Sequence, residues 1–233
     1  MIEIRALRYA WPRAGQDCLA IDALSVGAGE RLFLHGPSGC GKSTLLSLLA
    51  GVLLPREGTV SLAGRSWAAL PAAARDAHRA DHVGYLFQQF NLLPWLSVGE
   101  NVLLGCRFSR VRAARATQRS GSPAAQARSL LQRVGLAPEL WPRAARELSV
   151  GQQQRVAAAR ALIGTPEVVI ADEPTSALDG PLRDGFMDLL LGECRDSGST
   201  LVFVSHDERL ARRFDRTVSL PELNRAAHHE ASR

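Results

Sequence analysis

The chain has 233 residues, of which 46% are hydrophobic and 22% charged, so it is long enough to bury the core of one domain or of one domain with an insert. Its formal net charge of +5 suits a nucleotide, a nucleic acid or a membrane surface as a partner and selects none of them. The longest apolar stretch, residues 45–54, contains Ser47 and Gly51 and is too short to span a bilayer, which argues against a membrane-spanning protein.

Targeting signals and cysteine spacing indicate a cytoplasmic protein. The N-terminus has no basic segment followed by an apolar run, so no signal peptide is predicted. The four cysteines are scattered, without the spacing of a zinc site or a CxxC motif: Cys18, Cys40, Cys106 and Cys194. We therefore expect a reduced protein, and any membrane span that it serves has to come from another polypeptide.

Short apolar runs separated by glycine and helical segments predict an α/β fold. Near-alternating residues at 2–7 and 21–26 predict antiparallel strands. The run 32–34 leads into a glycine-rich loop and then a helix over residues 45–49. The runs 168–171 and 201–204 are typical of parallel strands buried on both faces. Strands that alternate with helices place ligands at the carboxyl ends of the strands.

The middle and the end of the chain differ in character from this core. Helical, Arg/Ala-rich sequence at about 88–150 predicts an inserted helical subdomain within a domain spanning residues 1–220. Five of its arginines fall between residues 107 and 119: Arg107, Arg110, Arg112, Arg115 and Arg119. We expect a solvated face there, with contact to anionic lipid headgroups or to an acidic loop of another protein as the alternative. Residues 221–233 form a polar tail that we expect to be poorly ordered.

The loop between the run at 32–34 and the following helix predicts a nucleoside triphosphate site. It fits G-x-x-x-x-G-K-[ST], with the strand before and the helix after that the motif requires. Backbone N–H groups of such a loop surround phosphates, and the helix N-terminus adds its positive end. Lys42 is expected to contact the β- and γ-phosphates, and Ser43 to offer its hydroxyl to Mg²⁺. The predicted ATP-binding residues here are Gly36, Pro37, Ser38, Gly39, Cys40, Gly41, Lys42, Ser43 and Thr44.

Two adjacent carboxylates follow the apolar run at 168–171. Asp172 is expected to hold Mg²⁺ through its water shell. Glu173 is expected to accept the proton of the attacking water, a general-base role worth about 10²–10⁴-fold in rate. An Asp-Glu pair by itself is common, but together with the phosphate loop it indicates a hydrolase of nucleoside triphosphates.

Further motifs resemble those of ABC ATPases. Residues 148–155, Leu-Ser-Val-Gly-Gln-Gln-Gln-Arg, closely resemble the ABC signature LSGGQ followed by Gln-Arg. Asp179 closes a segment that resembles the D-loop, His206 resembles the switch histidine, and Gln88 resembles the Q-loop glutamine. Tyr9 occupies the place of the aromatic residue that stacks on adenine, with Trp11 as its rival.

This resemblance covers about residues 1–220, with all elements in the family order. It implies a P-loop NTPase (RecA-like) core with an N-terminal antiparallel β subdomain and an inserted helical signature subdomain. One position departs from the family pattern, because Val150 stands where the family usually has glycine. A β-branched residue rarely adopts positive φ, so either this position needs no positive φ or the signature is slightly altered.

The resemblance also implies a mechanism shared between two chains. Lys42, Ser43, Asp172, Glu173 and His206 of one chain would face the signature of the other across bound ATP, with Gln88 contacting Mg²⁺ or the water. The signature residues acting in trans would be Ser149, Val150, Gly151 and Gln152. The implied partners are ATP, Mg²⁺, a second copy of the chain and an integral membrane permease, with the protein on the inner face of the cell membrane.

Residues 87–94 and 97–102 resemble the lipoprotein-releasing, macrolide-efflux and cell-division group of ABC ATPases, and residues 173–179 extend the likeness. They imply that the permease docks at about residues 88–102. The alternatives are the ATPase of another ABC importer or exporter, or a soluble ABC ATPase of DNA repair or translation. The last usually needs coiled-coil, zinc-bearing or second-cassette sequence that this chain lacks, so no nucleic acid is expected as partner.

Overall fold

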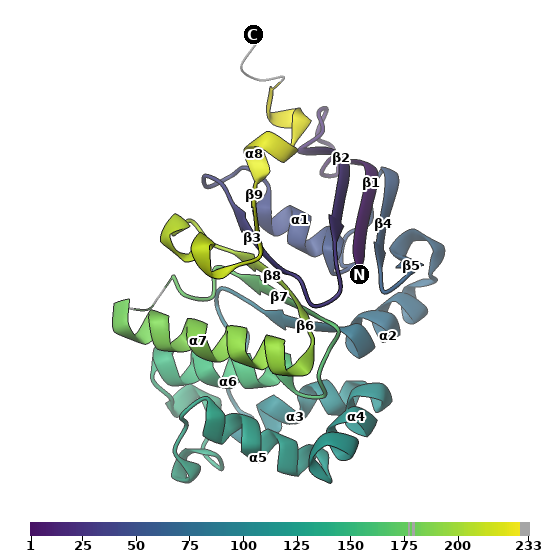
Figure 1. Ribbon diagram of the computed structural model, residues 1–233. Helices are drawn as coiled ribbons and strands as arrows, with labels where there is room; N and C mark the ends of the chain where they lie inside the picture. The colour runs from purple at the N-terminus through teal and green to yellow at the C-terminus, as the bar shows by residue number, and fades with distance from the viewer. Residues whose placement is uncertain (177, 179, 229–233) are drawn as a thin grey trace. The chain divides into compact units, whose positions relative to one another are not determined.

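The computed structural model describes residues 1–176, 178 and 180–228 (Figure 1). The chain divides into two compact units. Unit 1 comprises residues 1–79 and the segment from residue 200 onward, and unit 2 comprises residues 80–199. Each unit has its own strands and helices.

The first sheet of unit 1 is antiparallel, as predicted for the N-terminal strands. Its strands are β1 (Ile2–Tyr9), β2 (Leu19–Val26), β4 (Glu57–Leu62) and β5 (Arg65–Ser66), in the order β2-β1-β4-β5. Ile2 of the central strand β1 pairs with Val26 on one side and Leu62 on the other, and all three side chains are buried. Buried Trp67 donates its Nε1 proton to the Leu49 carbonyl at 3.0 Å, which ties the sheet to helix α1 (Lys42–Leu49).

Three parallel strands make up the second layer of unit 1. They are β3 (Arg31–His35), β8 (Thr200–Val204) and β9 (Arg216–Ser219), with β3 in the centre. The near-continuous apolar sequence of β3 and β8 is buried on both faces, which confirms the predicted parallel strands. The remaining elements are η1 (Trp67–Ala69), α2 (Ala72–His82), η4 (Glu208–Arg213), α8 (Leu220–Leu223) and η5 (Arg225–His228).

The start of the predicted C-terminal tail is packed rather than poorly ordered. Asn224 is buried, and its Oδ1 accepts from the backbone N–H of Ala20 at 2.8 Å. Its Nδ2 donates to the carbonyl of Cys18 at 3.0 Å. A single amide therefore satisfies two backbone groups of the sheet, and the polarity of the tail gave no sign of this contact.

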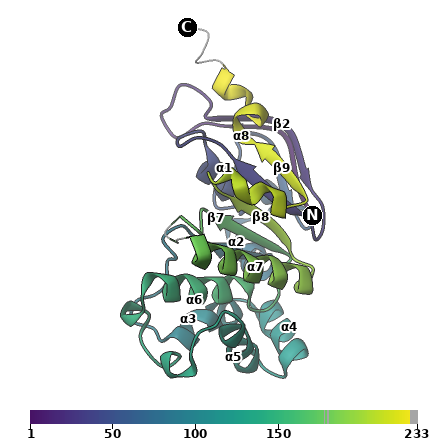
Figure 2. The same ribbon diagram turned by 60° about the vertical axis from the view of Figure 1, so that its left-hand side comes forward.

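Unit 2 holds two parallel strands and the helices around them. The strands are β6 (Val83–Leu86) and β7 (Val168–Asp172). The helices are α3 (Val98–Phe108), α4 (Arg110–Ser120), α5 (Pro123–Arg133), η2 (Pro138–Leu140), η3 (Ala145–Glu147), α6 (Val150–Leu162) and α7 (Gly180–Ser197). Figure 2 shows α3 to α6 gathered together, with α7 alongside α6. Strand β6 meets α6 closely, because a Cβ on Gly84 would lie 2.1 Å from the carbonyl oxygen of Ala161.

Two of the five clustered arginines turn inward, so the expected solvated face is wrong for them. Arg112 is only 4% exposed, and its guanidinium donates to the carbonyls of Ile163 and Ala161, each at 2.8 Å, and to that of Val83 at 3.3 Å. Burial lowers the pKa of Arg112 to about 10, so it is charged at neutral pH. A cation on the last carbonyls of α6 complements the helix dipole.

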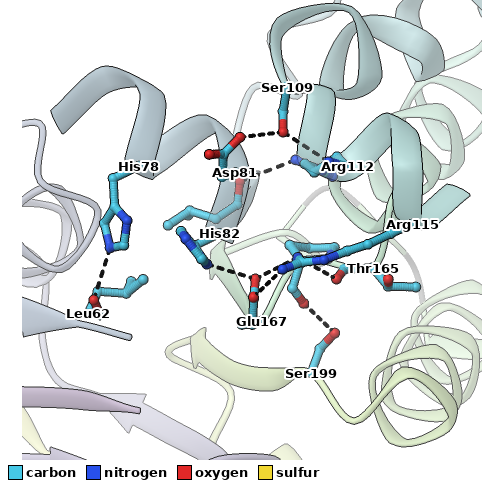
Figure 3. Close-up of polar contacts among 12 residues, drawn as sticks. Leu62, His78, Asp81, His82, Ser109, Arg112, Arg115, Thr165, Glu167 and Ser199 are labelled. Atoms are coloured by element: carbon cyan, nitrogen blue, oxygen red, sulfur yellow. Dashed lines mark hydrogen bonds and ion pairs between the residues drawn. The ribbon is translucent and has the colours of Figure 1, made fainter. Parts of the chain in front are cut away.

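Arg115 belongs to a second polar cluster, centred on Glu167. It donates to the Glu167 carboxylate at 2.8 Å, and His82 Nδ1 lies 3.0 Å from the same carboxylate (Figure 3). Burial by itself would raise the pKa of Glu167, but the contacts with His82 and Arg115 outweigh it and lower the pKa to about 2. The charged form of Glu167 therefore stabilises unit 2.

Replacing Glu167 by glutamine should weaken the fold and alter its acid sensitivity. A depressed pKa gives a stabilisation that is complete above the unfolded value near 4.5 and disappears as pH falls toward 2. We expect Glu167→Gln to reduce the free energy of unfolding at neutral pH by about 1–3 kcal/mol. It should also reduce the loss of stability between about pH 5 and pH 3. Urea titrations at several pH values measure both effects.

The exposed Glu139 provides the control, since Glu139→Gln should leave both quantities close to wild type. An acid dependence of Glu167→Gln identical to that of wild type would contradict the role of this carboxylate.

Candidate nucleotide site

The phosphate loop joins β3 to α1 and is shaped by a left-handed glycine. Gly41 is the N-cap of α1 at φ 100, a conformation that favours glycine. A Cβ there would also lie 2.9 Å from Leu19 Cδ2. Lys42 is buried, and its Nζ donates to the carbonyls of Gly36 and Pro37, each at 2.9 Å. The loop therefore holds an ammonium group within its own curve.

The other residues predicted for the loop lie where a phosphate could reach them. Pro37, Ser38, Gly39 and Ser43 are exposed, and Cys40 and Thr44 are half-buried. Ser43 lies in the first turn of α1, so its hydroxyl stands beside the positive end of that helix.

His206 lies at the same edge of unit 1 as the phosphate loop. Strands β3 and β8 are parallel, and Leu34 pairs with Val204, so the chain leaves both strands on one side. The loop from Gly36 and the turn that carries His206 line a cavity of about 340 Å³. The other residues around it are His35, Pro37, Glu208, Ser219 and Pro221.

The turn that carries His206 is braced on both sides. The N–H of Asp207 donates to Ser205 Oγ at 3.0 Å. The Asp207 carboxylate accepts from Arg209 Nε at 2.8 Å and from Arg209 Nη2 at 2.9 Å. These contacts fix the backbone on either side of an exposed imidazole.

The two candidate adenine-stacking rings differ in their exposure. Tyr9 is only 6% exposed and packs edge-on against Trp11, whose ring is 48% exposed. Tyr9 pairs with Leu19, which contacts Gly41 of the phosphate loop. The pairing of β1 with β2 buries the tyrosine and leaves the tryptophan exposed, so exposure favours Trp11 as the ring that a ligand could reach.

In unit 2, the predicted carboxylates and Gln88 share one strand edge. Leu86 at the end of β6 pairs with Ala171 near the end of β7. Asp172 ends β7, Glu173 follows it, and Gln88 stands exposed two residues after β6. Burial raises the pKa of Tyr85, and the neighbouring Asp172 charge adds to the increase.

Glu173 has an unusual backbone for a residue with a side chain. Its φ is +44, in the left-handed region that costs a non-glycine residue about 1–2 kcal/mol. The turn closes with a hydrogen bond from the N–H of Ser176 to the Glu173 carbonyl at 3.2 Å. Strain of this kind clusters at functional sites.

The signature residues form the N-terminus of α6. Ser149 is the N-cap, with a capping box in which Gln152 Oε1 accepts from the Ser149 N–H at 3.0 Å. Val150 is the first helical residue and does not have a positive φ, so this position needs no glycine. A Cβ on Gly151 would meet open space within the described chain. The open face of this helix end thus carries Ser149 and Gly151.

The structure does not test two of the predictions, the role of Asp179 and the binding of Mg²⁺. Asp179 of the predicted D-loop lies outside the described residues, whereas Ser176 and Leu178 beside it are described. Across the part of the chain that the structure describes, no three His, Cys, Asp or Glu side chains cluster as a metal site.

Comparison with known proteins decides the family. Residues 20–176 match the ABC transporter family, over more than half of the chain and including the phosphate loop, the signature and Glu173. The chain belongs to the ABC transporter family.

Individual relatives agree over most of this ABC protein. The ABC transporter ATP-binding protein YbbA of Escherichia coli is 44% identical over 84% of this chain and 83% of its own length. The lipoprotein-releasing system ATP-binding protein LolD of Anaeromyxobacter dehalogenans is 45% identical over 84% of this chain and 80% of its own length.

A solved structure supports the same assignment. The dimeric ATP-binding cassette MJ0796, in a post-hydrolysis state bound to ADP and Pi, superposes with a TM-score of 0.82. The two sequences are 32% identical, and the match covers 97% of this chain and 95% of that structure's chain. The family, the relatives and the fold identify an ABC ATPase, and the predicted fold class is confirmed.

The segment after Gln88 is ordered by Arg160 and Asn101, two residues of this ABC ATPase that the sequence motifs did not indicate. Phe90 and Asn91 both have positive φ, at +58 and +49, and Arg160 of α6 donates to the carbonyls of both. Buried Asn101 accepts from the N–H of Leu93 at 2.8 Å and donates to its carbonyl at 3.0 Å. No local motif marks these contacts, because each joins distant residues or depends on the fold of a loop.

No helix in the described ranges 1–176 and 180–228 is long and apolar enough to cross a membrane.

Proposed function

We propose that this chain is the ATP-hydrolysing subunit of an ABC transporter of the lipoprotein-release or macrolide-efflux type, and that it dimerises around two ATP molecules. The observation that carries this proposal is the exposed end of α6, where Ser149 and Gly151 present a helix N-terminus with open space in front of it. A phosphate bound to another copy fits such a surface. The phosphate loop of the same chain supplies the complementary half.

The binding roles follow from the chemistry of each group. Lys42 and the loop N–H groups bind the β- and γ-phosphates, and Trp11 stacks on adenine in place of Tyr9. Ser43, Gln88 and Asp172 provide a hydroxyl, an amide and a carboxylate oxygen, the hard ligands that Mg²⁺ takes alongside phosphate and water. Bound there, Mg²⁺ would neutralise phosphate charge.

The reaction is hydrolysis of ATP to ADP and phosphate. The water oxygen forms a bond to the γ-phosphorus while the bond from phosphorus to the ADP oxygen breaks. Glu173 accepts a proton from that water. His206 contacts the γ-phosphate, and Ser149, Val150, Gly151 and Gln152 of the second copy bind it from the open side.

The segment over residues 88–102 is proposed to receive the permease. Trp95 is 67% exposed, and Asn101 and Arg160 hold the surrounding backbone in one conformation. A rigid apolar anchor of this kind is typical of binding surfaces. Docking there would place the subunit at the cytoplasmic face of the membrane.

The dimeric site is tested by the dependence of ATPase activity on protein concentration. Because each composite site needs two chains, specific activity should rise with concentration and level off once dimers saturate. Saturating Mg-ATP and light scattering on the same samples link activity to the oligomeric state. Constant specific activity in a protein shown to remain monomeric with ATP would refute the proposal.

A further inference from the structure

A buried glutamine links the signature helix to the turn that carries Glu173. Gln154 lies in the second turn of α6 and is only 1% exposed. Its Nε2 donates to the carbonyl of Pro174, the residue directly after Glu173. Its Oε1 is buried and has no hydrogen-bond partner in the part of the chain that the structure describes. An amide that leaves its own oxygen unpaired contributes mainly through the donated bond.

The accepting carbonyl belongs to a strained turn. Glu173 is held at φ +44, and such a residue persists only when its surroundings over-determine the conformation. The bond from Ser176 to the Glu173 carbonyl closes the turn from within. Gln154 restrains the turn from outside, one residue after the strained position.

We propose that Gln154 is a positioning residue for Glu173, fixing the direction of its carboxylate relative to the signature helix. The inference rests on the proposed general-base role of Glu173. It also predicts communication within one chain. Ser149 and Gln154 belong to the same capped helix, so docking of Ser149 on the partner's ATP steadies the turn that hydrolyses the chain's own ATP.

The test is Gln154→Met, which keeps an unbranched side chain of similar length, removes the unpaired oxygen and deletes the donor. We expect kcat to fall about 10- to 100-fold, since a small misplacement of a catalytic group costs that much. KM and ATP affinity should stay within about twofold, because the lost interaction acts only on the transition state. Wild-type kcat in the folded variant would overturn the proposal.

Gln126→Met is the matched control for burial. Gln126 is 2% exposed and accepts from the N–H of Gly164 at 2.9 Å. This variant should lose stability and keep its kcat per folded molecule. Equal losses of kcat in both variants would show a general structural effect and overturn the specific role.

Gln154→Glu provides an independent readout should the methionine variant not fold. The ionised carboxylate cannot donate to Pro174, whereas the protonated form can, and burial raises the pKa of such a group. Activity relative to wild type should therefore rise between about pH 8 and about pH 6. A constant ratio across that range would contradict the donated bond.

A double variant separates this proposal from the role of Glu173. Once Glu173→Gln has removed the base, adding Gln154→Met should change the residual hydrolysis less than twofold. A further tenfold loss would show that Gln154 acts by another route and would overturn the proposal. Wild-type turnover in Glu173→Gln alone would refute the general-base role of Glu173. Normal turnover in Gln154→Met, together with an inactive Glu173→Gln, would refute only the positioning role of Gln154.

Discussion

Replacing Glu173 by glutamine should abolish most ATP hydrolysis and leave ATP binding intact. The amide keeps the size of the side chain and removes its ability to accept a proton, so the turnover rate should fall about 10²–10⁴-fold. Lys42 and the phosphate loop belong to unit 1 and are unchanged, so ATP is still captured. Because hydrolysis no longer separates the pair, an ATP-bound dimer should accumulate. Phosphate release and size-exclusion chromatography with Mg-ATP measure the two effects.

Glu139→Gln introduces the same chemical change at an exposed position of unit 2 and should hydrolyse ATP at the wild-type rate. Normal turnover of Glu173→Gln under saturating Mg-ATP would rule out Glu173 as the base.

The second large effect concerns the composite site, for which two inactive variants should complement each other. Ser149→Arg places a bulky cation where the partner's phosphate must dock, so closure fails while ATP affinity at Lys42 stays nearly normal. Lys42→Ala removes the ammonium that meets the phosphates and should weaken ATP binding about 10- to 100-fold. Each variant alone should lose about 100-fold in turnover or more. Their mixture should regain at most roughly a quarter of wild-type activity. At most about half of the dimers contain one chain of each variant, and each of these mixed dimers has one intact site of two.

The complementation is measured by titrating one variant into the other at constant total protein. Ser149→Lys serves as a second cationic variant and should behave like Ser149→Arg. Wild-type hydrolysis by Ser149→Arg alone would contradict the role of the signature in trans.

The sequence determined those parts of the protein that depend on short segments. A phosphate loop needs its glycines, lysine and hydroxyl in one local order, so residues 36–43 identify it without any tertiary contact. Parallel strands that are buried on both faces have near-continuous apolar sequences, and such runs located β3, β7 and β8. The signature was recognisable because its N-cap and capping box lie within four consecutive residues, from Ser149 to Gln152.

Only the tertiary structure decided which groups those segments meet. Arg112 reads as one arginine of an exposed run and instead caps the end of α6, more than 40 residues later in the chain. Tyr9 and Trp11 are alike in sequence, and the pairing of β1 with β2 buries one and exposes the other. In the sequence, Gln154 does not differ from the other polar residues of the signature, and only the structure shows that its amide donates to the carbonyl of Pro174. Each outcome depends on a contact between residues distant in the chain, and a pattern within one segment carries no information about the surface that folding brings against it.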